Sequence, residues 1–388
     1  MRMEILGYER KNGTVGIRNY VAVVSVMDSM NPIAARIAEM VSGTVLITDL
    51  FGRRMVGDNY EVRQKALIGM ATNPNVAAVL LLGLHEPAVL NLLEPLAALG
   101  MDVEGIAYQK EPGIASAIAS GARIATRLVC KHSATRPVGF PLSALRIGVE
   151  CGGSDYSSGI AGNPALGVAS NRLMDAGGAV VLSETAEIMG AEHIIARDAA
   201  TPEAGRKIYE AIEEIEKMAR IGGVPDIRKT NPSPDNILGG ISTLAEKALG
   251  AVKKAGSRPL RDVLGYCDRL STDASGFYFM NTASPACESM TGLAAGGVQI
   301  IVFNTGLGQP SANPVTPTIK MTGNPHTVSR GAEDLDIEVS SILTGRESLE
   351  EAGERVFQEI IAVARGKMTV CEVLRAGQSC ISVSGASM

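Results

Sequence analysis

The stretch Tyr20-Val-Ala-Val-Val-Ser-Val26 is a continuous run of β-prone, mostly apolar residues. A strand that is buried on both faces of a parallel sheet has this character. Residues 31–41 follow with apolar side chains at helical spacing, and Pro32 suits the first turn of a helix. Residues 45–47 (Val-Leu-Ile) then supply a second short strand. The order strand, helix, strand predicts a parallel sheet with right-handed crossovers.

The same alternation continues along the chain in two blocks. In the first block we expect further strands at 77–84 and 103–107 and helices at 87–99 and 113–127. In the second block the expected strands are 145–149, 179–182, 277–281, 299–303 and 318–321, and the expected helices are 163–175, 202–220, 235–254, 286–295 and 348–365. The predicted fold class is therefore α/β, with two doubly wound, mostly parallel-sheet (Rossmann-like) units. We place an N-terminal domain at 1–135, a linker at 136–143 and a C-terminal domain at 144–388.

Composition limits the class of protein. The chain has 388 residues, which is more than one ordinary core needs, and 46% of them are hydrophobic while 20% are charged. It has no apolar run long enough for a membrane span and no long apolar stretch at its beginning, so we expect a soluble cytoplasmic protein without a membrane partner. The net charge of -5 and the scattered Lys and Arg residues argue against a nucleic-acid partner. The six cysteines include no C-x-x-C pair, which excludes a zinc-finger pattern.

The segment Glu150-Cys-Gly-Gly-Ser-Asp155 follows a predicted strand, and the next helix begins near Pro164. Its two glycines let the backbone approach a ligand closely, and free N–H groups in such a loop can face an anion. Cys151, Ser154 and Asp155 are candidate ligands for a metal ion or a substrate. The alternative is a tight turn in which a Ser or Asp side chain caps the helix.

The segment from Ser183 to His193 also follows a strand and contains three glutamates and one histidine. Carboxylate oxygens and an imidazole suit a hard or borderline divalent cation, such as Fe(II), Mn(II) or Mg(II). Glu184, Glu187 and His193 are therefore candidate ligands. An acidic helix start that favours the helix dipole, beside a structural histidine, is the alternative.

Two basic residues lie beside predicted strands. Lys320 ends a loop that runs from Asn304 and is rich in Gly and Pro. It either binds an anion at the strand end or faces solvent. Arg18 lies just before the first strand, where it either clamps a carboxylate bidentately or pins a chain terminus to the sheet. Nicotinamide and serine-hydrolase functions lack support, because no G-x-G-x-x-G opens a helix and no G-x-S-x-G is present.

Several of these segments together resemble the altronate/galactarate dehydratase family. The resemblance is carried, in a fixed order over nearly the whole chain, by the stretch 7–19 (G-Y-x-R-x-x-G-x-V-G-I-R-N), Cys151-Gly-Gly-Ser-Asp155, residues 163–167 (N-P-A-L-G), residues 182–193 (L-S-E-T-A-E-I-M-G-A-E-H), Thr305-Gly306, Asn313-Pro314 and Lys320. It implies a lyase that dehydrates sugar acids and depends on iron or manganese.

The chain departs from the sugar-acid dehydratases at three strand ends, where those enzymes carry cysteines and this chain reads 27–29 (M-D-S), 51–53 (F-G-R) and 83–86 (G-L-H-E). The departures resemble a subgroup that forms the large (beta) subunits of (2R)-sulfolactate sulfo-lyases, in which a small alpha subunit is a separate chain. This implies conversion of sulfolactate to pyruvate and sulfite. Arg53 then becomes a candidate for sulfonate binding, with an ordinary loop charge as the alternative.

The resemblance implies roles for the candidate residues. The base and further catalytic groups would come from Asp155, Glu184, Glu187 and His193. The ligands of a divalent metal ion, Fe(II) first and Mn(II) or Mg(II) next, would be Cys151, Asp155, Glu184 and His193. The residues expected to bind a small 2-hydroxy acid substrate are Arg18, Ser154, Thr305, Asn313, Lys320 and Arg53. We also expect an oligomer. The other functions considered are a sugar-acid dehydratase and a non-catalytic subunit that binds a sugar acid.

Overall fold

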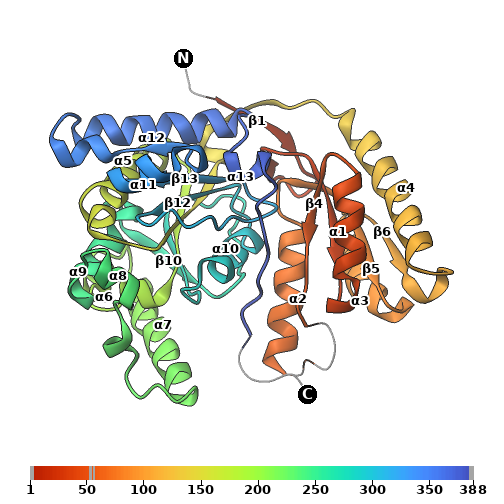
Figure 1. Ribbon diagram of the computed structural model, residues 1–388, viewed down its shortest axis with the longest axis horizontal. Helices are drawn as coiled ribbons and strands as arrows, with labels where there is room; N and C mark the ends of the chain where they lie inside the picture. Colours follow the sequence, from red (N-terminus) through yellow and green to blue (C-terminus); the bar gives the residue numbers. More distant parts are fainter. Residues whose placement is uncertain (1–3, 52–54, 56, 384–388) are drawn as a thin grey trace.

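The computed structural model describes residues 4–51, 55 and 57–383. Over these residues the chain forms two α/β units that lie side by side (Figure 1), one around a sheet of four strands and one around a sheet of seven. Every strand pair within these two sheets is parallel. The predicted class of two doubly wound, mostly parallel units is confirmed.

The small unit is built around β3 (Tyr20–Ser25), the first of the buried strands predicted from the sequence. Its sheet has the order β4-β3-β5-β6, with β4 at Thr44–Ile47, β5 at Val76–Gly83 and β6 at Asp102–Ala107. One face packs on α1 (Asn31–Met40) and α4 (Ile114–Ser133), and the other on α2 (Asp58–Ala71) and α3 (Glu86–Ala98). The central strands are apolar throughout because both of their faces are covered.

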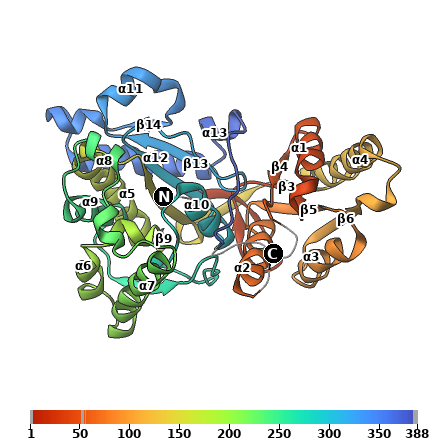
Figure 2. The same ribbon diagram turned by 60° about the horizontal axis from the view of Figure 1, so that its bottom comes forward.

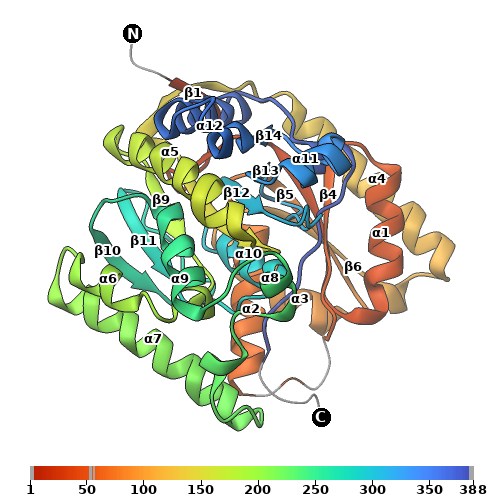
Figure 3. The ribbon, with the colours of Figure 1, turned by 60° about the vertical axis from the view of Figure 1, so that its left-hand side comes forward.

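The large unit has the strand order β10-β11-β9-β8-β12-β13-β14. These strands are β8 (Arg146–Gly152), β9 (Ala179–Leu182), β10 (Leu260–Leu264), β11 (Gly276–Met280), β12 (Ile300–Thr305), β13 (Thr318–Thr322) and β14 (Ile337–Glu338). One face packs on α5 (Asn163–Asp175), α7 (Pro202–Ile221) and α12 (Leu349–Ala364), and the other on α10 (Ala286–Ala295). Figure 3 brings this unit forward, and Figure 2 shows α10 beside α2 where the two units meet.

The predicted helix over 235–254 is wrong as a single element. It is divided into α8 (Pro234–Leu238) and α9 (Leu244–Val252). Gly239 and Gly240 break the helix, since Gly240 has a φ of 87° that residues with a Cβ rarely adopt. Thr243 then caps α9 by accepting a hydrogen bond from the backbone N–H of Glu246.

The segment expected to be a plain linker contains a strand that was not predicted. This strand, β7 (Val138–Pro141), pairs antiparallel with β1 (Glu4–Glu9), and β1 also pairs with β2 (Val15–Gly16). The remaining helices are α6 (Glu192–Arg197), α11 (Pro325–Gly331) and α13 (Val370–Val373). No helix in the described part of the chain is long and apolar enough to cross a membrane.

The chain after α12 returns to the junction between the two units (Figure 1). Arg18 of the small unit pairs with Glu372, with Nε 2.7 Å from Oε1, and the Tyr20 hydroxyl donates to the same oxygen at 2.5 Å. Farther along, the Ser379 hydroxyl donates to the carbonyl of Thr48 at 3.0 Å. These contacts bind the last segment to the small sheet and so hold the two units together.

Candidate active site

The large sheet has a topological switch point between β8 and β12. The strands that follow β8 directly are added on one side of it, and β12 to β14 are added on the other. Thr305 at the end of β12 is the register partner of Gly152 at the end of β8. Ligands of open α/β sheets bind outside the carboxyl ends of the strands at such a point. The two loops selected from the sequence, after β8 and after β12, therefore meet where a ligand site is expected.

Asp155 lies in the loop after β8, and hydrogen-bond donors enclose its carboxylate. Oδ1 accepts from the Ser157 hydroxyl at 2.6 Å and from the backbone N–H and hydroxyl of Ser158 at 3.0 and 3.1 Å. Oδ2 accepts from the Asn324 amide at 2.5 Å. A Cβ at Gly306 would lie 2.3 Å from Cγ of Asp155, so only glycine fits there. These contacts fix the carboxylate in one orientation at the switch point.

Glu184 follows β9 and has a left-handed backbone conformation with a φ of 70°. Residues with a Cβ adopt this region rarely, and such strain clusters at functional sites. Its side-chain Oε2 accepts from the backbone N–H of Cys151 at 3.0 Å, and its own N–H donates to the Thr282 hydroxyl at 2.8 Å. The unusual backbone therefore directs the carboxylate toward the end of β8.

A lysine that sequence reasoning did not select completes this arrangement. Lys254 lies in a 3-10 turn directly after α9 and is fully buried. Its ammonium donates to Sγ of Cys151 at 2.7 Å and to Oε2 of Glu184 at 3.0 Å. Glu150, also fully buried, lies next to Cys151 on β8. We call Glu150, Cys151, Glu184 and Lys254 the buried charge centre.

Burial controls the ionisation of this centre. It raises the pKa of Cys151 to about 12, and it raises the pKa of Glu150 well above its ordinary value, with the Glu184 charge adding to the effect. Burial also raises the pKa of Glu184, although Lys254 offsets part of the rise. For Lys254, burial lowers the pKa, but Cys151 and Glu184 raise it by more. With Lys254 and Glu184 both charged, this ion pair carries no net charge.

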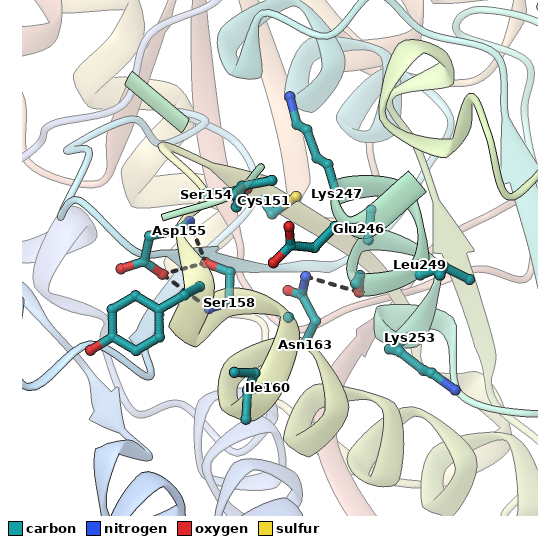
Figure 4. A pocket seen from close by; sticks show the side chains of 15 residues that line it. Cys151, Ser154, Asp155, Ser158, Ile160, Asn163, Glu246, Lys247, Leu249 and Lys253 are labelled. Carbon is teal, nitrogen blue, oxygen red and sulfur yellow. Dashed lines mark hydrogen bonds between the residues drawn. The ribbon is translucent and has the colours of Figure 1, made fainter. Parts of the chain in front are cut away.

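A cavity of about 280 Å³ opens beside the buried charge centre (Figure 4). The end of β8 contributes Cys151 to its wall, the loop after β8 contributes Ser154 and Asp155, and α9 contributes Lys247 and Leu249. The remaining lining residues are Tyr156, Ser158, Gly159, Ile160, Asn163, Ile241, Glu246, Gly250, Ala251 and Lys253. We call this space the β8 pocket.

Glu187 is connected to the β8 pocket through Lys247. The Lys247 ammonium lies 2.9 Å from Oε1 of Glu187 and donates to Oδ1 of Asn231 at 2.9 Å. The Lys247 and Glu187 side chains are only 8% and 11% exposed. Lys247 and Lys254 are seven residues apart, which is two helical turns, within a segment rich in Ala, Leu and Gly. Two lysines at helical spacing in an apolar segment were the signal that the sequence prediction missed.

Lys320 in β13 borders a second, smaller cavity. Its ammonium lies 3.8 Å from the centre of the Phe303 ring and donates to the carbonyls of Gln309 and Ser311, the latter at 3.1 Å. In the described chain its acceptors are thus carbonyls, and burial lowers its pKa to about 8. The cavity, of about 150 Å³, is also lined by Thr305, Gly308, Pro310, Thr327, Arg330 and Cys371.

The structure does not bring the four predicted metal ligands together. Cys151 and Glu184 are joined through the ammonium of Lys254, whereas the carboxylate of Asp155 contacts a different set of groups, on Ser157, Ser158 and Asn324. His193 is exposed on α6 and does not line the β8 pocket. Among the described residues, no group of three or more His, Cys, Asp or Glu side chains is arranged to hold a metal ion. The residues present do not fit a divalent cation at this position.

The predicted substrate-binding residues are dispersed. Ser154 lines the β8 pocket and Thr305 lines the smaller cavity. Arg18 donates two hydrogen bonds to the carboxylate of Glu372 near the end of the chain. This agrees with the alternative prediction for Arg18, in which it attaches a chain terminus to the sheet. Asn313 accepts from the backbone N–H of Val315 at 3.0 Å and so orders its own loop. Arg53 lies outside the described residues.

Comparison with known proteins gives consistent matches over most of the chain. Residues 142–387 match the model of the D-galactarate/altronate dehydratase C-terminal domain, and residues 7–133 match the second domain of D-galactarate dehydratase/altronate hydrolase. The chain is 34% identical to (2R)-sulfolactate sulfo-lyase subunit beta of Chromohalobacter salexigens over 95% of this chain and 94% of that protein. It is 32% identical to altronate dehydratase of Bacillus subtilis over 82% of this chain and 65% of that protein. For altronate dehydratase of Escherichia coli the identity is 31%, over 95% of this chain and 75% of that protein.

Proposed function

This chain belongs to the D-galactarate/altronate dehydratase family, and from this premise we propose that it is the large subunit of a lyase that converts (2R)-sulfolactate into pyruvate and sulfite. The observation that carries the proposal is the match to a sulfo-lyase beta subunit, at 34% identity over 95% of this chain. The identities to the two altronate dehydratases are lower, at 32% and 31%. Members of the family are lyases and dehydratases, so an elimination is the common chemistry.

The proposed reaction is a β-elimination. A base removes the proton from C2, the electron pair of that bond forms a C2–C3 double bond, and the C3–S bond breaks with its electrons leaving on sulfite. The resulting enol of pyruvate takes up a proton at C3 and loses the proton of its C2 hydroxyl, which gives the keto acid. The chain must therefore provide one positioned base and positive charge for two anionic groups, the carboxylate and the sulfonate.

We assign the base to Asp155. Among the four acidic and imidazole residues selected from the sequence, Asp155 alone lines the β8 pocket. Its Oδ2 has a single hydrogen-bond donor in the described chain, Asn324, which leaves one lone pair for a proton. Glu184 forms an ion pair with Lys254 in the buried charge centre and is therefore not assigned as the base.

Two lysines supply the positive charge in this proposal. Lys247 lines the β8 pocket. The ammonium of Lys320 donates, among the described residues, to the carbonyls of Gln309 and Ser311 in the loop after β12 and to no carboxylate. An ammonium that is shielded from water attracts an anion more strongly than an exposed one. The proposal therefore requires that the carboxylate and the sulfonate of one substrate reach one lysine each.

We also propose a separate small partner subunit, because the similar protein of Chromohalobacter salexigens is named as one subunit of its enzyme. The mouth of the β8 pocket supports this. It is lined by the exposed apolar side chains of Tyr156, Ile160 and Leu249, which are 38%, 61% and 44% exposed. Clustered exposed apolar side chains mark interaction sites.

The second candidate function is dehydration of a sugar acid. It is favoured by identities of 31–32% to two altronate dehydratases, little below the 34% to the sulfo-lyase subunit. The experiment that decides is to offer the chain with its candidate small subunit (2R)-sulfolactate, altronate and galactarate. Sulfite and pyruvate in equal amounts support the proposal. A 2-keto-3-deoxy sugar acid without sulfite establishes the dehydratase, and no product from any of the three favours a binding subunit.

A further inference from the structure

The ammonium of Lys254 lies where a metal ion shared by Cys151 and Glu184 would have to bind. Its Nζ is 2.7 Å from Sγ of Cys151 and 3.0 Å from Oε2 of Glu184. A divalent metal binds a thiolate at about 2.3 Å and a carboxylate oxygen at about 2.0–2.2 Å, so it would occupy the same small volume between these donors. Lysine and metal therefore exclude each other, because both are cations and both need this space.

The charges of the centre lead to the same conclusion. Glu184 already balances the charge of Lys254, because the two form an ion pair at 3.0 Å. Oε2 of Glu150 accepts from the hydroxyls of Ser183 and Ser289 at 2.6 and 3.1 Å. A divalent cation beside the lysine would leave excess positive charge in a site closed to water, which is costly without further anions.

We propose that Lys254 takes the structural place of a metal ion between Cys151 and Glu184. In this role it is a positioning residue. The oxygen of Glu184 that accepts from Lys254 also accepts from the backbone N–H of Cys151. One carboxylate oxygen thereby joins the end of β8, the end of β9 and the turn after α9. Two of these segments, the end of β8 and the turn after α9, line the β8 pocket. The proposal does not depend on which substrate the chain takes.

The test uses Co(II) as a spectroscopic probe of the full-length chain. Cobalt bound to a cysteine thiolate gives a charge-transfer absorption in the near ultraviolet that cobalt bound only to oxygen lacks. We expect no such band when wild-type protein is titrated with Co(II). Lys254→Ala removes the ammonium and opens the space, so it should produce the band. The double variant Lys254→Ala/Cys151→Ser should lose the band again.

Lys229→Ala is the matched control, since Lys229 is a lysine whose side chain is 84% exposed. It should behave as the wild type. A thiolate band in wild-type protein that disappears in Cys151→Ser would overturn the proposal, and this comparison needs no change at Lys254. A folded Lys254→Ala protein without the band would overturn it as well. If Lys254→Ala does not fold, the comparison of the cobalt spectra of wild-type protein and Cys151→Ser still tests the proposal. None of these measurements uses turnover, so they are independent of whether sulfite is produced.

Discussion

The ammonium of Lys254 lies 3.0 Å from the carboxylate of Glu184, and both side chains are closed to solvent. The two residues are 70 positions apart in the chain. Their pairing brings the turn after α9 onto the end of β9, directly beside the β8 pocket.

Glu184→Gln should destabilise the protein strongly, because it leaves the Lys254 ammonium buried without a carboxylate. Breaking a buried ion pair by removing one partner costs about 3–5 kcal/mol, and we expect a loss of this size in the free energy of unfolding measured by chemical denaturation. Glu203→Gln, which removes an exposed partner of Arg206, should produce no measurable change. Equal stabilities of the two variants would contradict the buried pairing.

Asp155→Asn should lower kcat while the protein stays folded. The amide keeps the size of the side chain but cannot accept a proton from C2. Loss of a positioned base costs about a hundredfold or more in rate, to be measured with the substrate that the product assay identifies. Asp198→Asn, at an exposed carboxylate on the surface, is the control. A decrease below about tenfold, with an unchanged melting temperature, would place the base elsewhere.

Lys320 should make the affinity for an anionic substrate depend on pH. Burial lowers its pKa to about 8, so its ammonium is present below that pH and is lost as the pH rises through it. We expect KM to rise as the pH increases through about 8. In Lys320→Arg, whose charge does not titrate in this range, KM should stay level across the same interval. An identical pH profile for both proteins would remove Lys320 from substrate binding.

Arg18→Ala separates a structural role from a role in substrate binding. Arg18 forms two hydrogen bonds with the carboxylate of Glu372, and both side chains are about nine-tenths buried. The variant should lose stability and should be cleaved more readily by protease within residues 365–383, while KM changes little. Normal stability together with a large rise in KM would instead restore the predicted role as a substrate clamp.

The chain should need its small partner for efficient turnover. We expect a partner of roughly 80–100 residues, the size of one small domain. The rate of product formation should increase steeply when the two subunits are mixed, and size-exclusion chromatography should show a complex. If this chain alone turns over as fast as the mixture, the two-subunit proposal fails.

The fold was predictable because its signals are local. The run from Tyr20 to Val26, the helical spacing after it and the repetition of this pattern indicate parallel strands with covering helices. Where the pattern was misread, the cause lay in backbone conformation and in long-range pairing. Gly239 and Gly240 divide a segment that has continuous helical spacing. The strand β7 gains its strand character only by pairing with β1, more than a hundred residues earlier in the chain.

The sequence by itself determined the α/β class and the family, and it identified the loops after β8, β9 and β12, since glycines and polar residues directly after apolar runs can be read locally. Only the tertiary structure decided which of their side chains meet. In the folded chain His193 is exposed and lies apart from the buried charge centre. Arg18 forms an ion pair with Glu372. Lys254 donates hydrogen bonds to both Cys151 and Glu184. The physical reason is that a buried charge must find its partner in space, and the partner comes from whichever segment the packing brings there. The spacing of residues in the sequence does not indicate which buried charges will pair.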